Sequence, residues 1–506
     1  KMPNRKPSFI FFFLIAVSAV LLSIAYIFPE DGLSIGHFHR IKFPTLNKLI
    51  GDSQPEYTSI DNTILLADSL ANALSAELEP PLDQTETAKQ KWINVDSMRA
   101  AEKYLIPIEF ADNDASVLYS FFNALDEVVF DKKKTHVFHY GDSQIEGDRM
   151  TSYIRDRLQR RFGGYAIGML PASNVNLVKL IAHENSGNWH RYPMFSKEGE
   201  SGENANYGAM TVYSSYTPYP TDSNLKDRQK TSAWVKYSSA KSIYNSSNKF
   251  KQLKVFYGPV FDTVKVKSVT PDTSYAAKLI GNKKLNVYTL EFDQAISDVE
   301  IKFASTISPQ IYGISLEAPF GIQVSNIAMR GNSGTDFHKL DRELFSKMHA
   351  ELNTSLIILQ YGGNVLPYIK DTARAEAYGN QFYNQIRIIQ KAVPNASIIL
   401  IGPADMSIKD GEYYVTYPML ETIRDALKKA AFKAKIGYWD MYEAMGGKNS
   451  MPSWVAANPP LAGADYTHFT PRGAQIISEF FYKALIIEYE TYNNQRLKNE
   501  AKSSNP

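Results

Sequence analysis

The sequence predicts an α/β fold, a parallel β-sheet with helices on both faces, interrupted by an all-β module and preceded by one transmembrane helix. Three observations support this prediction. Short apolar runs alternate with helix-length amphipathic segments around residue 140 and again after residue 318, and such alternation builds parallel sheets covered by helices. Residues 186–318 instead alternate at period two between turn residues, as strands do. An uncharged run near the N-terminus is long enough to span a bilayer.

The uncharged run covers residues 8–28, and charged residues flank it asymmetrically. Lys1, Arg5 and Lys6 precede it, and Glu30 and Asp31 follow it. The positive-inside rule then places the short N-terminus in the cytoplasm and the rest outside. A cleaved signal peptide is the alternative, but its apolar region usually spans only about 7 to 15 residues. We therefore expect a single-pass signal anchor in a cytoplasmic membrane.

Composition excludes several classes of protein. The chain has 506 residues, which suggests two or three domains. Its net charge is only +2 and its basic residues are dispersed, so nucleic acid is not an expected partner. It has no cysteine, which excludes disulfides, zinc-thiolate sites and a cysteine nucleophile. No cofactor or metal site is expected.

Shifts in composition divide the chain into successive parts. The region after the apolar run mixes Pro, Ser, Asp and Thr and is interpreted as a stalk. The expected order is a cytoplasmic tail at 1–7, the transmembrane anchor at 8–28, the stalk at 29–97, the first part of the α/β domain at 98–185, the β-rich insertion at 186–318, the second part of the α/β domain at 319–493 and a flexible tail at 494–506.

The first part of the α/β domain contains a strand at residues 136–140 that leads into Gly141-Asp142-Ser143. A helical stripe follows, in which apolar residues recur every four positions until Gly163. A strand, a tight turn and a helix in this order expose a nucleophile at the end of a parallel sheet. After the insertion, strands are expected at 321–329, 354–360, 396–402 and 436–442, and helices at 335–352, 376–393, 419–435 and 474–492.

Ser143, Asp465 and His468 are the residue types of a catalytic triad. A serine hydroxyl is a weak nucleophile at neutral pH, so it needs an imidazole to accept its proton and a carboxylate to orient that imidazole. The spacing Asp-x-x-His lets one short turn present Asp465 and His468 together. Taken alone, the same pair can simply cap the following helix.

Two further clusters follow expected strands and can donate hydrogen bonds. Residues 331–334 read Gly-Asn-Ser-Gly, and Gly362-Gly363-Asn364 follows the strand at 354–360. Backbone N–H groups and an asparagine amide stabilise the oxyanion of a tetrahedral intermediate. Each glycine cluster alone is most simply a tight turn, but all of these clusters are expected at one edge of one sheet.

These motifs stand in the order of the four sequence blocks of the SGNH, or GDSL-type, hydrolases, and the chain resembles that family over residues 137–164 and 319–487. The resemblance implies a flavodoxin-like three-layer α/β/α fold, with Ser143 as nucleophile, His468 as general base and acid, and Asp465 orienting His468. It also implies an oxyanion hole formed by Ser143, Gly334 and Asn364, although Gly331 is an alternative to Gly334. The family's aspartate after the third-block asparagine is Val365 here.

The β-rich insertion resembles the architecture of bacterial peptidoglycan O-acetylesterases of the SGNH group. That resemblance implies a serine esterase, anchored in the bacterial inner membrane and facing the periplasm, that removes O-acetyl groups from an envelope polysaccharide such as peptidoglycan. One alternative is an O-acyltransferase that works beside a membrane-bound acyltransferase. Another is a non-catalytic scaffold that binds glycan through the β-module.

Three further residues are candidates for binding the substrate. Gln144 and Gly363 adjoin the proposed nucleophile and oxyanion donor, and Trp189 offers an aromatic ring on which a sugar can stack. For Trp189, a buried ring that anchors a loop is the alternative interpretation. His136 and His139 lie on one strand without a carboxylate at matching spacing, so they are interpreted as hydrogen-bonded strand residues.

Overall fold

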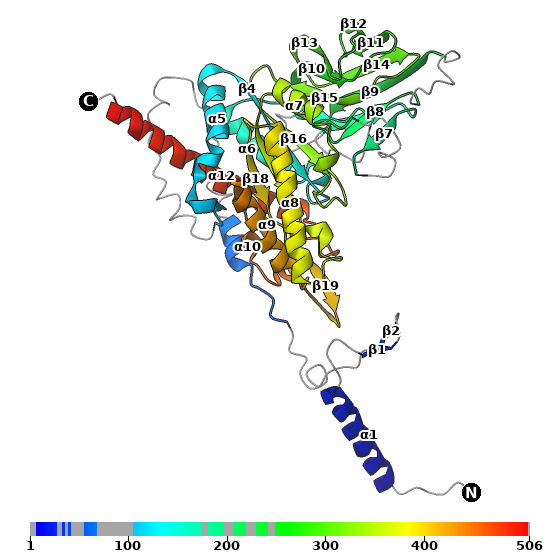
Figure 1. Ribbon diagram of the computed structural model, residues 1–506, viewed down its shortest axis with the longest axis vertical. Coiled ribbons are helices and arrows are strands. Elements are labelled where there is room, and N and C mark those ends of the chain that lie inside the picture. The colour runs from blue at the N-terminus through cyan, green and yellow to red at the C-terminus, as the bar shows by residue number, and fades with distance from the viewer. Residues whose placement is uncertain are drawn as a thin grey trace. The chain divides into compact units, whose positions relative to one another are not determined.

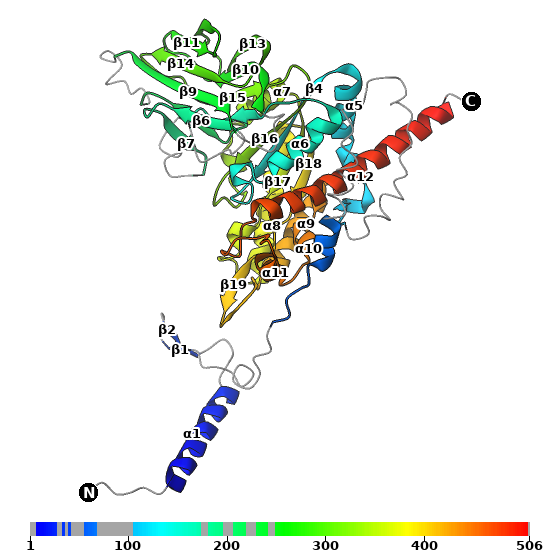
Figure 2. The same cartoon turned by 180° about the vertical axis from the view of Figure 1, so that it is seen from behind.

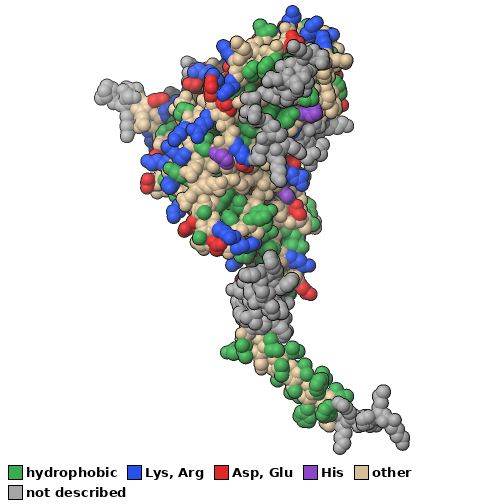
Figure 3. Space-filling view, turned by 45° about the vertical axis from the view of Figure 1, so that its right-hand side comes forward, with side chains coloured by type: hydrophobic (Ala, Val, Ile, Leu, Met, Phe, Trp, Pro, Cys, Tyr) green, Lys and Arg blue, Asp and Glu red, His purple; other side chains and the backbone are tan. Residues whose placement is uncertain are grey.

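The computed structural model describes residues 7–27, 33–35, 39–41, 55–67, 105–173, 181–195, 206–218, 229–240 and 248–503. The chain divides into two units, residues 1–56 and 57–506. In the first unit, helix α1 (Pro7–Ile27) contains an uncharged segment, Ser8–Ile27, that is long and apolar enough to cross a membrane. Apolar side chains cover its surface (Figure 3). Strands β1 (Leu33–Ile35) and β2 (His39–Ile41) pair antiparallel.

The second unit is built on a six-stranded sheet whose strands are parallel except for β3 at one edge (Figure 1). The central strands are buried on both sides, because helices cover both faces. From edge to edge the strands are β16 (Gly321–Ala328), β4 (Lys134–Gly141), β17 (Thr354–Gln360), β18 (Ser397–Ile401), β21 (Gly437–Trp439) and β3 (Ile108–Glu109).

Two hydrophobic cores lie on the two faces of this sheet. Val137 of β4 packs in the core formed with α5 (Tyr119–Asp131), α6 (Thr151–Phe162) and α12 (Pro471–Ser503), which Figure 2 shows crossing that face. Its neighbour Phe138 points the other way, into the core formed with α7 (Arg342–Glu351), α8 (Thr372–Ala392) and α9 (Leu420–Ala434). Three layers result, which confirms the predicted α/β/α fold.

Short elements connect these layers. They are the 3₁₀ turns η2 (Ala111–Asn113), η3 (Ala115–Leu118), η4 (Glu146–Asp148), η7 (Phe337–Lys339) and η8 (Gly363–Val365), the helices α10 (Met441–Met445) and α11 (Ser450–Ala456), and the hairpin of β19 (Ser407–Asp410) and β20 (Tyr413–Thr416). Turn η4 lies between Ser143 and α6, so the helix begins eight positions after the serine.

The predicted all-β insertion is present as two antiparallel sheets. One has the order β13-β10-β15-β8-β7 with β5 added on β15, and the other has the order β12-β11-β14-β9-β6. Their strands are β5 (Gly168–Leu170), β6 (Ile181–Asn185), β7 (His190–Pro193), β8 (Val212–Ser215), β9 (Thr231–Ser239), β10 (Phe250–Tyr257), β11 (Val264–Val269), β12 (Ser274–Leu279), β13 (Asn286–Ile296), β14 (Val299–Ser305) and β15 (Ile311–Glu317). Large apolar side chains from both sheets form a third core.

The structure corrects three predicted boundaries. The β-module begins before residue 186, because β5 and β6 pair with its sheets; both strands are too short to show a clear period-two pattern. Part of the predicted stalk, residues 57–67, packs on the α/β domain through the buried side chains of Ile60 and Leu66. The predicted flexible tail is helical as far as Ser503, since α12 continues past residue 493.

Candidate active site

Ser143 lies in the turn that follows β4, at the carboxyl edge of the parallel sheet. The turn is closed by the Asp142 carboxylate, which accepts a hydrogen bond from the Gln144 N–H at 2.9 Å. Gly141 is required just before it, because a Cβ there would lie 2.9 Å from Ile145 and 3.1 Å from the Gln360 carbonyl oxygen. Close packing beneath the turn therefore fixes the position of the serine.

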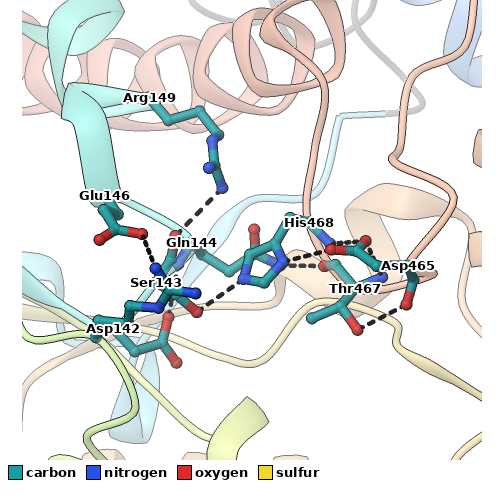
Figure 4. A network of polar contacts seen from close by, with 9 residues as sticks. Asp142, Ser143, Gln144, Glu146, Arg149, Asp465, Thr467 and His468 are labelled. Atoms are coloured by element: carbon teal, nitrogen blue, oxygen red, sulfur yellow. Dashed lines mark hydrogen bonds and ion pairs between the residues drawn. The ribbon is translucent and has the colours of Figure 1, made fainter. Parts of the chain in front are cut away.

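Ser143, His468 and Asp465 form a continuous hydrogen-bonded chain (Figure 4). His468 Nε2 lies 2.8 Å from Ser143 Oγ, and His468 Nδ1 lies 2.8 Å from Asp465 Oδ2. An imidazole held by a carboxylate on one nitrogen can accept a hydroxyl proton on the other. The structure thus brings Ser143 to the Asp465–His468 pair, although Ser143 and His468 are 325 positions apart in the sequence.

Hydrogen bonds within the loop fix the conformation of the segment that carries Asp465 and His468. Asp465 Oδ1 accepts the N–H groups of Thr467 and His468, each at 3.1 Å. Between them, Tyr466 has a φ of 53°, a left-handed conformation that is uncommon for a residue with a Cβ. The Gln144 side-chain amide donates to the Thr467 carbonyl oxygen, so the loop is joined to the serine turn.

The two carboxylates near Ser143 have opposite pKa shifts. Burial raises the pKa of Asp142 to about 6, against hydrogen bonds from Gln144 and Asn364 that lower it. For Asp465, the hydrogen bonds from His468 and Thr467 outweigh burial and lower the pKa below its ordinary value. Asp465 is consequently ionised at neutral pH, as a group that orients an imidazole should be.

The predicted oxyanion donors differ in their availability. The Ser143 N–H has no hydrogen-bond acceptor among the described residues. The Asn364 amide lines the same pocket but donates to Asp142 Oδ2 at 2.9 Å and to the Asn332 carbonyl oxygen at 3.1 Å. Its position is compatible with an oxyanion only after one of these acceptors is replaced.

Gly334 does not fit the predicted role of oxyanion donor. Its N–H is buried and donates to Asn332 Oδ1 at 2.6 Å. Its Cα faces the core, since a Cβ there would lie 2.5 Å from Phe382 and 2.7 Å from Tyr361. Gly331, the alternative, has open space around its Cα. Glycine at 334 is explained by close packing and a φ of 76°.

A small cavity of about 30 Å³ adjoins Ser143. Gln144 and Gly363, both predicted to contact substrate, line it. Its walls also include Asp142, Asn364, Gln360, Tyr361, Gly402, Pro403, Ala404, Met406, Met441 and Thr467. Gly363 keeps the cavity open, because a Cβ at this position would meet Met406 Sδ at 2.8 Å.

Trp189 is not part of this site, contrary to one reading of the sequence. Its indole N–H donates to the Trp234 carbonyl oxygen at 3.0 Å, and its ring packs edge-on against Tyr216 and Phe303 in the core of the β-module. The alternative interpretation, an aromatic anchor for a loop, describes it correctly.

The sequence did not identify several residues that line the cavity or that hydrogen-bond to the oxyanion donor Asn364. Met406 lies in the connection after β18 and Met441 begins α10, and nothing in their spacing marks them. Asp142 was visible in the Gly-Asp-Ser motif, but its contact with Asn364 requires the neighbouring strand. Arg149, whose Nη1 donates to the Ser143 carbonyl oxygen at 3.2 Å, was likewise hidden in the helical stripe.

The strand histidines are hydrogen bonded to neighbouring side chains. His136 Nε2 lies 2.6 Å from Ser325 Oγ, and His139 contacts Gln360 and Thr151. Burial lowers the pKa of His139 to about 4, so it is neutral at pH 7. Within the described residues, no group of His, Asp and Glu side chains has the geometry of a metal site.

Comparison with known proteins shows a fold shared with a solved structure. No family model matches the chain, and no curated protein sequence is significantly similar to it. A solved structure of a peptidoglycan O-acetylesterase superposes with a TM-score of 0.56 at 21% identity, covering 74% of this chain and 96% of that one. An acetyl xylan esterase matches 32% of this chain and 81% of its own at 16% identity and a TM-score of 0.25. The first likeness shows that the two proteins share a fold.

Proposed function

We propose that this protein is an SGNH-type serine esterase that removes small O-acyl groups, most simply acetyl, from an envelope polysaccharide such as peptidoglycan. The observation that carries the proposal is the hydrogen-bonded chain from Ser143 through His468 to Asp465. The fold shared with a peptidoglycan O-acetylesterase supports the substrate class, and helix α1 supports attachment to a bacterial inner membrane with a periplasmic catalytic domain.

In the proposed reaction, Ser143 Oγ attacks the ester carbonyl carbon while His468 Nε2 accepts the hydroxyl proton. The oxyanion accepts a hydrogen bond from the Ser143 N–H, and it replaces one of the two present acceptors of the Asn364 amide, Asp142 Oδ2 or the Asn332 carbonyl oxygen. His468 then donates its proton to the departing sugar oxygen, which leaves an acyl-serine. Water attacks that ester with His468 as base, and the carboxylic acid is released. Asp465 keeps the His468 Nδ1–H directed away from the serine throughout.

The cavity beside Ser143 supports a short acyl group. The cavity is small, about 30 Å³, and Met406, Met441 and Pro403 line it with apolar atoms. An acetyl methyl fits such a space, whereas longer chains must displace a methionine. We expect 4-nitrophenyl acetate to be hydrolysed at least about tenfold faster than 4-nitrophenyl butyrate, since misfitting one or two methylenes costs about 1 to 3 kcal/mol.

Replacing Ser143 tests the proposal directly. Ser143→Ala should lower hydrolysis of 4-nitrophenyl acetate by about 10⁴-fold or more without changing thermal stability. Ser333→Ala is a matched control, because the Ser333 hydroxyl contacts Thr335 outside the proposed triad. Unchanged turnover in Ser143→Ala would contradict the esterase proposal and favour the alternative of a non-catalytic scaffold.

The same site supports acyl transfer, because a sugar hydroxyl can replace water in the second step. A membrane-bound acyltransferase would then be a partner, and α1 would keep the two proteins in one membrane. Incubating the purified chain with 4-nitrophenyl acetate and a chito-oligosaccharide distinguishes the two reactions by mass spectrometry. Acetate without acetylated sugar supports hydrolysis, and acetylated sugar supports transfer.

A further inference from the structure

The outer face of the five-stranded sheet in the β-module carries an array of lysines, here called the lysine face. Side chains on these strands alternate, so that one set is buried between the sheets and the other set points to solvent. The outward set contains Lys236, Lys265, Lys267, Lys278 and Lys302.

The strand register places like charges directly opposite each other on this face. Lys265 pairs with Lys278 across β11 and β12, and Lys267 pairs with Lys302 across β11 and β14. Directly opposed like charges destabilise a sheet. A sheet that keeps two such pairs bears a cost that is relieved when an anion binds between them.

Neighbouring carboxylates compensate only part of this charge. Lys302 Nζ lies 2.7 Å from Glu300 Oε1, and Lys236 Nζ lies 3.9 Å from Glu184 Oε1. Lys265, Lys267 and Lys278 are exposed and have no carboxylate within ion-pair distance in the part of the chain that the structure describes. The face therefore retains a positive surplus that is open to solvent.

An aromatic side chain continues one row of the array. Trp234 of β9 lies opposite Lys302 of β14, which in turn lies opposite Lys267 of β11. Adjacent strands are about 4.8 Å apart, so the backbone positions of these three residues span about 10 Å across the sheet. The indole is partly exposed. Sugar rings present flat apolar faces that stack on indoles, while the ammonium groups attract carboxylates.

We propose that the lysine face binds a linear polysaccharide that carries carboxylate groups. Charge complementarity selects the carboxylates, and the row of Trp234, Lys302 and Lys267 selects a polymer with sugar rings. A membrane surface fits less well, because interfacial binding requires large apolar side chains among the basic ones. Phe261 and Ile280, exposed apolar residues of the module, lie outside the paired strands. The proposal is independent of ester hydrolysis.

Native affinity electrophoresis of the full chain in detergent tests this proposal, with polygalacturonate as the acidic probe and dextran as the neutral one. Polygalacturonate should retard the protein at low salt and dextran should not. The double variant Lys265→Glu/Lys267→Glu should raise the Kd for polygalacturonate at least about tenfold, because it reverses two contacts in a salt-dependent interaction. Trp234→Ala should weaken binding about threefold or more, since aromatic stacking contributes about 1 to 3 kcal/mol.

A matched charge reversal controls for the net charge of the protein. Lys370→Glu/Lys391→Glu makes the same change at exposed lysines of the α/β domain and should leave the Kd within about twofold. Equal losses in both double variants would overturn the proposal, as would binding to phosphatidylglycerol vesicles without binding to polygalacturonate. If Lys265→Glu/Lys267→Glu lowers the melting temperature, Lys265→Gln/Lys267→Gln replaces it. Ser143→Ala should bind like the wild type, which separates this result from the esterase test.

Discussion

The two sides of the active site are built differently. On the serine side, Asp142 and Gln144 are 4% and 7% exposed and rest on the carboxyl edge of the sheet. On the histidine side, the side chains of His468 and Asp465 are 31% and 54% exposed and belong to a surface loop. The nucleophile is therefore fixed by the core of the domain, whereas the base depends on a few local contacts.

This difference predicts different consequences of mutation on the two sides. Changes in the exposed loop should alter the reaction rate with little effect on the free energy of unfolding, since little buried surface is lost. Changes at the buried residues of the turn, Asp142 and Gln144, should alter stability as well, because their polar groups were removed from water. The four predictions below test that division.

The largest effect is expected from His468→Ala. Loss of the base should reduce hydrolysis of 4-nitrophenyl acetate by about 10⁴-fold or more while the melting temperature stays close to that of the wild type. His338→Ala is the matched control, because the ring of this exposed histidine hydrogen-bonds to the Thr335 carbonyl oxygen, outside the proposed triad. Adding Ser143→Ala should cause little further loss, since residues that act as a unit are not additive. A multiplicative loss would contradict the triad.

A smaller effect is expected from Asp465→Asn. The asparagine oxygen can still accept the Thr467 and His468 N–H groups, but its amide presents a donor to His468 Nδ1. The imidazole then favours the wrong tautomer, and kcat should fall by up to about 10⁴-fold. Asp465→Ala, which also removes the loop contacts, should be no more active. A wild-type rate in Asp465→Asn would show that the carboxylate does not orient His468.

Tyr414 is expected to act as a positioning residue for the loop. Its ring stacks on Tyr466, with centroids 3.6 Å apart and planes within 5°, and the Ser407 N–H donates to the Tyr466 carbonyl oxygen at 3.1 Å. Tyr414→Ala should lower kcat about tenfold, because loss of the stacked ring misplaces the loop that carries His468. KM should change little, because Tyr414 does not bind the substrate. Tyr414→Phe keeps the stacked ring and should restore the rate. Equal losses in both variants would argue against stacking.

For Asp142 in the buried turn, the expected effect is on the pH dependence of the free energy of unfolding rather than on the reaction rate. The pKa of Asp142 rises from its ordinary value of 3.8 to about 6, so between these values the folded state binds more protons than the unfolded state. Wild-type stability should fall as pH rises through this window, by up to about 3 kcal/mol. Asp142→Asn lacks this ionisation.

Chemical denaturation at pH 4 and pH 7.5 measures this contribution. The stability of Asp142→Asn relative to the wild type should increase from the lower to the higher pH, because only the wild type then buries a charge. A relative stability that is the same at both values would show that Asp142 does not ionise with a raised pKa. Asp465→Asn, in the exposed loop, is the comparison: its stability relative to the wild type should not increase from pH 4 to pH 7.5, because the pKa of Asp465 is not raised.

Local sequence patterns determined much of this protein. Three features depend on residues that are neighbours in the sequence, so the sequence alone predicts them. They are the apolar run of α1, the alternation of strands and helices, and the period-two strands of the β-module. Ser143, Asp465 and His468 were also identifiable, because their chemistry restricts residue type and the Asp-x-x-His spacing fits one turn.

Only the tertiary structure decided which of several similar groups face the site. The sequence does not distinguish Gly331 from Gly334 as an oxyanion donor. In the structure, Gly334 packs against Tyr361 and Phe382, and its N–H donates to Asn332, so it is not available to an oxyanion. Trp189 packs against the core of the β-module, and the lysine face appears only when four strands align in register. Orientation depends on contacts between residues far apart in the chain, which no local pattern encodes.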